Sequence, residues 1–342
     1  MPKTRVTLRS LAQQLGLHVS TISRVLNGSD EEACKAASIE RVREIRALAR
    51  ELGYQANPQA KTLRTKRSRE LAVLVPRLSD IVMATMYEGI DEAAERHGYT
   101  TYVSNTLDDP ERQRALGERA LNRNVEGLII ADAHCTPEPS WLEELAARGV
   151  NFLLVIRRRG QHLSISCDDM EGGRLAAAHL WQQGHRRVAV LGGEAHSSSG
   201  KDRTRGFIRF YQEQGCPVAE GNILHGLFDT ATGRQQGAQL LAQGQRPTAI
   251  FCVNDFLAIG LYGAMRQYDL VPGRDIAVVG YNDTPLAAQL SIPLTSINSF
   301  ARQQGAASVE VFMQLLDGQF PQSTLIRPQL NVRESSQFQC AH

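Results

Sequence analysis

The sequence predicts a mixed α/β protein: a small all-α headpiece with a helix-turn-helix, followed by a two-lobed body of doubly wound parallel sheets. Two observations predict this fold. Apolar residues recur at helical spacing up to residue 52, and beyond residue 70 short β-rich runs alternate with amphipathic helical runs. The 342 residues suffice for two or three domains of ordinary size, so a sizeable core can form.

The headpiece begins with two short predicted helices on either side of Gly16. Their apolar side chains recur at helical spacing: Leu8, Leu11, Ala12, Leu15, Val19, Ile22, Val25 and Leu26. Glycine adopts a positive φ without steric cost, which suits the tight turn between the helices. A third helix is predicted to follow Ser38 as its N-cap and to end at Gly53, so that residues 28–37 form a connection.

The body is predicted from alternating runs. Strands are expected at Leu71–Val75, Thr100–Ser104, Gly127–Ala131, Phe152–Ile156, Val188–Leu191, Ala249–Val253 and Ile276–Tyr281. Helices are expected at Met83–His97, Glu111–Arg123, Ser140–Arg148, Gly172–Gln183, Arg203–Glu213, Thr232–Ala242 and Asp255–Tyr268. Strands that alternate with helices form parallel sheets, and this many units suit two lobes.

The two ends of the chain differ in net charge. The net charge is only +2, but residues 1–70 hold 14 basic and 7 acidic residues, which leaves 24 basic and 29 acidic residues in the remainder. A basic module on an acidic body is typical of a protein that binds a polyanion with one end. Asn57-Pro58 breaks the helical pattern, and the polar stretch Gln59 to Thr65 that follows it is predicted to be a linker that becomes helical when bound.

Several other protein classes are disfavoured. No apolar run approaches the roughly 18 residues of a membrane-spanning helix, and residues 1–10 lack the apolar segment of a signal peptide, so a cytoplasmic location is expected. The six cysteines form no CxxC pair, and His134-Cys135 has no further ligand nearby in the sequence, so no metal and no cofactor are expected. The stretch GGEAHSSSGKD lacks P-loop spacing, and no catalytic residue is predicted.

The segment TLRSLAQQLGLHVSTISRVLNG, Thr7 to Gly28, is the most specific motif in the chain. In a helix-turn-helix the second helix lies in the major groove with its N-terminal residues facing the base edges. Val19, Ser20 and Arg24 would face outward, with Arg24 placed to bind guanine and Val19 to touch a thymine methyl group. Short polar side chains suit phosphates: Thr7, Thr21, Ser23 and Asn27. The alternative, a plain helical hairpin, is disfavoured by the surplus of basic and hydroxyl side chains.

These residues resemble the lactose-repressor (LacI/GalR) family of bacterial regulators. In the headpiece the resemblance rests on TLRSLAQQLGL, STISRVLNG and ARELGYQANPQAKTLRT. In the body it rests on CDDMEGGRLAAAHLWQQGHRRVAVLGG, RTRGF, AIFCVNDFLAIGLYGAM and DIAVVGYNDTPLAAQLSIPLTSI. Two features of the headpiece depart from the family pattern: the 28–37 connection is about five residues longer than expected, and His18 stands where a serine commonly caps the recognition helix.

The resemblance implies a homodimer or tetramer that binds double-stranded operator DNA. Two linker helices would fold together on a palindromic operator, and Leu63 would enter the minor groove with Ala60 and Arg64 beside it. The implied domains are a headpiece at 1–56, a hinge at 57–69, a periplasmic-binding-protein-like body at 70–336 and a tail at 337–342. The body would hold an N-terminal lobe of about 70–166 and 299–327, which includes helix Ala301–Leu316, and a C-terminal lobe of about 167–298 and 328–336.

The resemblance also implies a small-molecule site in the cleft between the lobes. The matching positions are Arg203, Phe228, Asn254, Asp255 and Asn282. They offer an aromatic face and polar groups for a hydroxylated ligand. Arg157, Arg158 and Arg159 follow a predicted strand, and Arg158 is included as a ligand residue because guanidinium groups suit carboxylate or phosphate.

The predicted function is therefore a ligand-responsive, allosteric repressor of carbohydrate or sugar-acid catabolism genes. Its effector would be a sugar, a sugar acid or a sugar phosphate. Two alternatives without a transcriptional role stay open: a solute-binding protein and a sugar-modifying α/β enzyme. The basic headpiece and the absence of a catalytic motif disfavour both.

Overall fold

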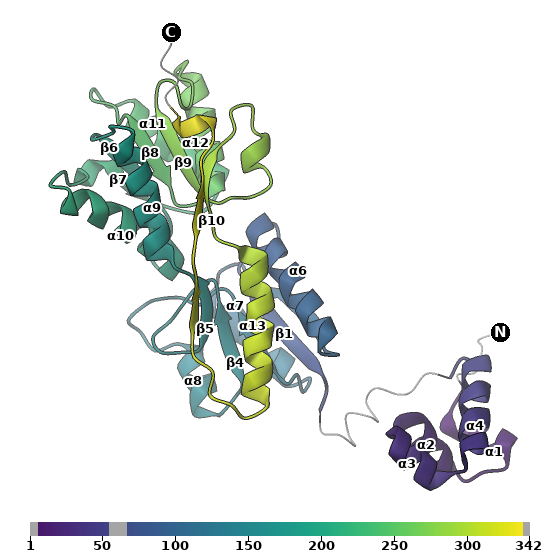
Figure 1. Cartoon of the computed structure of the whole chain (residues 1–342). Helices are drawn as coiled ribbons and strands as arrows, with labels where there is room; N and C mark the ends of the chain where they lie inside the picture. The colour runs from purple at the N-terminus through teal and green to yellow at the C-terminus, as the bar shows by residue number, and fades with distance from the viewer. Residues whose placement is uncertain (1–5, 55–66, 338–342) are drawn as a thin grey trace. The chain divides into compact units, whose positions relative to one another are not determined.

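The computed structural model describes residues 6–54 and 67–337. The chain divides into two compact units, one that ends at Ser68 and one that begins at Arg69 (Figure 1). The predicted hinge residues Ala60, Leu63 and Arg64 lie outside the described residues. The helices of the described residues include none long and apolar enough to cross a membrane.

The first unit contains the predicted helices at nearly the predicted limits. Its helices are α1 (Leu8–Leu15), α2 (Val19–Asn27), α3 (Asp30–Ala36) and α4 (Ile39–Glu51). Gly16 has a φ of 61° in the turn after α1, and the Ser38 side chain caps α4 by accepting a hydrogen bond from the backbone N–H of Arg41. Leu11, Ile22 and Ile45 are fully buried and hold the helices together.

Helix α3 corrects the prediction that residues 28–37 are only a connection. Ser29 and Glu32 form a capping box, in which each side chain accepts a hydrogen bond from the other residue's backbone N–H. Ala33 is fully buried, and Asp30 forms an ion pair with Arg46 of α4 at 2.7 Å. The connection therefore adds a packed helix of 7 residues, about two turns, to the headpiece.

The second unit contains two six-stranded sheets, with the orders β11-β5-β4-β3-β1-β2 and β12-β10-β9-β8-β6-β7. We call the first sheet and its helices the N-lobe and the second the C-lobe. The strands are β1 (Glu70–Val75), β2 (Thr100–Asn105), β3 (Gly127–Ile130), β4 (Phe152–Val155), β5 (Ser164–Cys167), β6 (Val188–Gly192), β7 (Ile223–His225), β8 (Ala249–Cys252), β9 (Ala277–Asn282), β10 (Thr295–Asn298), β11 (Thr324–Ile326) and β12 (Gln329–Asn331). All pairings are parallel except β10–β12.

The helices of the second unit follow the predicted order. They are α6 (Ile81–Arg96), α7 (Pro110–Leu121), α8 (Trp141–Ala147), α9 (Asp169–Gln182), α10 (Ser198–Glu213), α11 (Thr230–Leu241), α12 (Asp255–Gln267) and α13 (Ala301–Leu316). Helix α10 begins five residues before the predicted start, because Ser197 caps it through the backbone N–H of Gly200. Part of the stretch that lacks P-loop spacing therefore forms the first turn of a helix.

Three chain crossings join the lobes. The chain passes from β5 of the N-lobe to α9 of the C-lobe, from β10 of the C-lobe to α13 of the N-lobe, and from β11 to β12 (Figure 1). Parallel strands place their carboxyl ends at one edge of a sheet, and ligands of such sheets bind beyond that edge. Residues that follow the strands of either sheet are therefore the first place to seek a site.

Glycines set the closest helix packing of the body. The pairs α6–α13, α9–α10 and α11–α12 each cross at two glycines, where an added Cβ would lie 2.0–2.3 Å from a backbone carbonyl oxygen of the facing helix. These glycines are Gly89 and Gly305, Gly173 and Gly206, and Gly233 and Gly260. Because no side chain separates the backbones, each helix pair forms a closely packed layer on its sheet.

Candidate functional site

Helix α2 presents one polar face and one buried face. Ile22 and Val25 are buried in the headpiece core, whereas Ser20 and Arg24 are exposed. His18 caps the helix: its Nδ1 accepts a hydrogen bond from the backbone N–H of Ser20 at 3.3 Å and lies 2.7 Å from the Ser20 hydroxyl. A histidine thus performs the capping that a serine would perform.

Five other residues of the described headpiece are predicted to bind DNA. Thr7 is exposed and caps α1 in a capping box with Ser10. The remaining ones are half-buried on α2: Val19, Thr21, Ser23 and Asn27. Arg24 forms no ion pair among the residues that the structure describes, so its guanidinium group is available to an external partner.

A cavity of about 270 Å³ lies between the lobes, beyond the carboxyl ends of strands from both sheets. Its N-lobe wall consists of Pro76, Arg77, Ser79, Asp80, Asp108 and Arg157. Its C-lobe wall consists of Glu194, Leu227, Phe228, Asp229, Thr230 and Phe256. The volume lies near the lower end of the range for small-molecule sites, roughly 300–1,000 Å³.

The cavity wall carries more acidic than basic groups. Two guanidinium groups, of Arg77 and Arg157, face four carboxyl groups, of Asp80, Asp108, Glu194 and Asp229. Burial raises the pKa of Asp80, and burial together with the nearby Asp108 raises the pKa of Glu194. The rings of Phe228 and Phe256 supply the apolar part of the wall.

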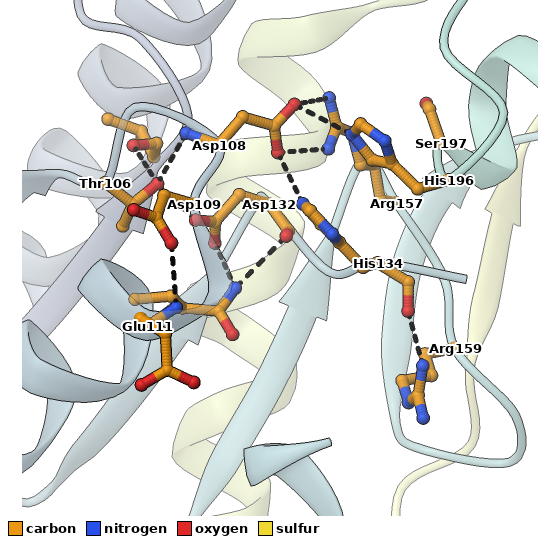
Figure 2. A network of polar contacts seen from close by, with 12 residues as sticks. Thr106, Asp108, Asp109, Glu111, Asp132, His134, Arg157, Arg159, His196 and Ser197 are labelled. Carbon is orange, nitrogen blue, oxygen red and sulfur yellow. Dashed lines mark hydrogen bonds and ion pairs between the residues drawn. The ribbon is translucent and has the colours of Figure 1, made fainter. Parts of the chain in front are cut away.

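Asp108 and Arg157 form a bidentate ion pair at the cavity wall (Figure 2). The two guanidinium N–H groups donate to the two carboxylate oxygens at 2.7 and 2.9 Å, and both side chains are more than nine-tenths buried. Burial opposes the charge of Asp108, but hydrogen bonds from His134, His196 and Arg157 outweigh it and hold the pKa of Asp108 well below its usual range. The charge of Arg157 is therefore already compensated within the protein.

Arg203, predicted as a ligand residue, lies in the C-lobe core beside the cavity wall. Its Nε donates to Asp169 at 2.8 Å, one terminal nitrogen donates to the Val253 carbonyl at 2.9 Å, and the guanidinium carbon lies 3.8 Å from the Tyr281 ring centroid. Burial by itself would lower the pKa of Arg203, but Asp169 more than offsets it, so the pKa is raised and the group stays charged.

Asn254 and Asp255 hold the start of α12 in place. The Asn254 Oδ1 accepts from the backbone N–H of Leu257, and its Nδ2 donates to the Phe228 carbonyl. Asp255 accepts hydrogen bonds from the backbone and hydroxyl of Thr284 and from the Ser296 hydroxyl. Burial raises the pKa of Asp255 to about 6. Both side chains are thus engaged within the C-lobe.

Asn282 and Arg158 lie away from the cavity wall. Asn282 has a φ of 97°, accepts a hydrogen bond from the Ser299 hydroxyl, and lines a second hollow of about 510 Å³ between the lobes. Arg158 reaches from the N-lobe to α10 of the C-lobe, where its guanidinium group pairs with Asp202 and its backbone N–H donates to Ser198. In the arginine triplet it is Arg157 that lines the cavity.

Of the residues predicted to bind the effector, only Phe228 lines this cavity. The sequence interpretation missed Arg77, Asp80, Asp108 and Glu194, each of which follows a strand of one of the sheets within five residues. A stricter search of the positions just after each predicted strand could have found them, because those positions converge in parallel sheets.

Comparison with known proteins extends this description. Residues 177–336 match the model of the periplasmic binding protein-like domain. Two curated relatives are named HTH-type transcriptional repressor PurR: one from Pasteurella multocida (strain Pm70) is 26% identical over 335 residues, which cover 96% of this chain and 98% of the relative. The other, from Aliivibrio fischeri (strain ATCC 700601 / ES114), is 29% identical over 314 residues, which cover 90% and 91%.

A solved structure matches both units of the chain. The Lac repressor dimer bound to operator and the anti-inducer ONPF has a TM-score of 0.87 and 28% sequence identity, and the match covers 98% of this chain and all of that chain. The order of headpiece and body, and the mixed α/β fold with parallel sheets, are therefore shared with a repressor that was solved on its operator.

Proposed function

We propose that this chain is a member of the lactose-repressor (LacI/GalR) family of transcriptional regulators, a proposal that its curated relatives and a matching solved structure support. We further propose that it binds a palindromic operator as a dimer and that a neutral small molecule in the inter-lobe cavity changes this binding. The observation that supports the proposal best is that one chain contains both a helix suited to DNA binding and a cavity suited to a small molecule. The exposed Arg24 lies on a recognition helix with a buried apolar face, and the body has a lined cavity beyond its strand ends. Its relatives are transcriptional repressors and not enzymes.

The charges of the cavity favour a neutral ligand over a sugar acid or a sugar phosphate. A buried guanidinium group needs a partner charge, but Arg157 has Asp108 and Arg203 has Asp169. The remaining carboxyl groups of the wall would repel an anion and would accept hydrogen bonds from hydroxyl groups. Phe228 would pack against the apolar side of a ring.

A neutral sugar meets these requirements, and we propose it as the effector, with carbohydrate genes as the regulated set. A nucleobase is the second candidate, because the name PurR of the curated relatives suggests purine rather than carbohydrate metabolism. A nucleobase is also neutral, and its flat face suits Phe228 and Phe256. It offers fewer hydroxyl groups to the carboxyl-rich wall than a sugar does.

A binding screen tests the effector class. We expect thermal-shift screening of matched neutral sugars, sugar acids, sugar phosphates and nucleobases to select a neutral sugar. Calorimetry of that ligand at two salt concentrations should give nearly the same affinity, because screening by salt acts on charges. Phe228→Ala should abolish binding, whereas Phe320→Ala, which alters a phenylalanine that is 97% exposed, should leave binding unchanged. A selected anion whose affinity falls as salt rises would contradict the proposal.

Arg24→Ala tests the role of α2. We expect it to weaken operator binding by about 1 to 3 kcal/mol and to relax the preference at one base position, because a bidentate contact to guanine would be lost. Binding to a set of operators with single base changes measures both effects. Arg43→Ala, which removes an exposed charge from α4 instead, should weaken binding to all these operators about equally. The same uniform loss with Arg24→Ala would show that Arg24 reads no base.

A further inference from the structure

We propose that Asp108, His134 and His196 form a binding site for a divalent transition-metal ion, such as Zn²⁺, that joins the two lobes (Figure 2). Asp108 follows β2 and His134 follows β3, both in the N-lobe, whereas His196 follows β6 in the C-lobe. His134 lies 26 residues after Asp108, and His196 lies 62 residues after His134. Because these separations match no known spacing of metal ligands, the sequence does not indicate the site.

The three side chains converge through the atoms that bind metals. His134 Nε2 lies 3.0 Å from Asp108 Oδ1, and His196 Nε2 lies 3.1 Å from Asp108 Oδ2. One ligand atom from each residue lies within 4.8 Å of the other two, and the imidazole rings stack with their centroids 4.0 Å apart. Two imidazoles and one carboxylate match the ligands of zinc sites that keep a fourth position open.

The protonation and charge of the cluster are compatible with replacing its hydrogen bonds by bonds to a metal ion. Each imidazole directs Nε2 at the carboxylate, and a neutral imidazole can bind a metal through Nε2 when its proton resides on Nδ1. Arg157 holds Asp108 in its ionised form by donating one hydrogen bond to each carboxylate oxygen. The cavity wall carries four carboxyl groups and two guanidinium groups, and this surplus of acidic groups favours a cation over an anion.

The cluster is accessible and adjoins the cavity. The side chains of His134 and His196 are 16% and 25% exposed, and Asp108 is itself part of the cavity wall. A water molecule or an oxygen of the cavity ligand could take the open position of the metal. Because the ligands come from both lobes, the metal would stabilise this arrangement of the lobes and act as a second effector.

Spectroscopic titration of the full chain tests the site without DNA or cavity ligand, so its outcome is independent of the proposed repressor function. After treatment with a chelator, we expect Co²⁺ to give visible d–d absorption that saturates at one ion per protomer, and Zn²⁺ to displace it. His134→Gln and His196→Gln should each weaken Zn²⁺ binding at least about tenfold. His162→Gln is the matched control, because His162 also lies beside a carboxylate, of Glu143 at 3.3 Å, and should leave binding unchanged.

A second measurement guards against variants that fail to fold. In the unaltered protein, Zn²⁺ should protect His134 and His196, but not His162, from diethylpyrocarbonate, as read by mass spectrometry of peptides. Absence of saturable Co²⁺ absorption, equal Zn²⁺ affinity in the His196→Gln variant, or equal modification of all three histidines would overturn the proposal and leave the cluster as hydrogen bonds to Asp108.

Discussion

Gly260→Ala is expected to lower the free energy of unfolding by about 3 kcal/mol, whereas Gly263→Ala, three residues along the same helix, should raise it slightly. An added Cβ at Gly260 would lie 2.2 Å from the Thr230 carbonyl oxygen and 2.7 Å from the backbone nitrogen of Arg234. Backbone atoms of a packed helix cannot move aside as a flexible side chain can, so α11 and α12 would have to separate.

Gly263 is the matched control. Its added Cβ would have one neighbour within 4 Å, the Arg234 Cδ at 3.8 Å, which is an ordinary contact. Alanine is favoured over glycine inside a helix by up to about 1 kcal/mol. Urea unfolding of the two variants, with their oligomeric state checked beside the parent protein, measures the difference. Equal stability of the two variants would show that the helices are not in backbone contact at Gly260.

Asp169→Ala is expected to destabilise the protein by about 3 to 5 kcal/mol, because it leaves the Arg203 guanidinium group buried without its counter-charge. Both side chains of this pair are at least 94% buried, and Asp169 also accepts a hydrogen bond from the Tyr281 hydroxyl. The effect should reach the cavity wall, since Arg203 also donates to the carbonyl of Val253, just before the residue that caps α12.

Glu171→Ala provides the comparison in the same helical turn. Glu171 pairs with Arg174 at 2.6 Å, but that pair is partly exposed, so its removal should cost less than about 1 kcal/mol. Chemical unfolding measures both variants. A loss below about 1 kcal/mol for Asp169→Ala would mean that water reaches Arg203, and Arg203 would then be free to bind a ligand directly, as the resemblance implied.

The headpiece could be predicted well because its signals are local. The apolar spacing on both sides of Gly16 and the cap at Ser38 are contained in a few residues, and the structure confirms helices α1, α2 and α4. Helix α3 was missed although Ser29 and Glu32 form a recognisable capping box. Residues 28–37 were predicted to be a connection because of their number, and the helix signals within them were not considered.

The strands of the body also differ in how well their own residues predict them. Buried central strands such as β3 and β8 are continuous apolar runs, and these were predicted. The strands β5, β7, β10, β11 and β12 were missed because each has only three or four residues and includes at least one polar side chain. Their pairing depends on sheet neighbours far away in the sequence, which local periodicity does not show.

The candidate site was less predictable than the fold. The adjacent residues Arg157, Arg158 and Arg159 have different partners: Asp108 at the cavity, Asp202 in the C-lobe, and Glu143 in the N-lobe. Nothing local to the triplet distinguishes them. The same holds for Asp108, His134 and His196, which only the parallel arrangement of β2, β3 and β6 and the contact between the lobes bring together.

Operator affinity with and without ligand tests the central claim most directly. The operator would be selected from a random DNA pool with the full chain, and its dissociation constant measured by fluorescence anisotropy in the presence and absence of the neutral ligand found by thermal shift. We expect the selection to yield an inverted repeat bound by one dimer, and the ligand to change the affinity by about 5-fold to 150-fold. Selection without an inverted repeat, or an affinity that the bound ligand leaves unchanged, would contradict a ligand-responsive operator-binding repressor.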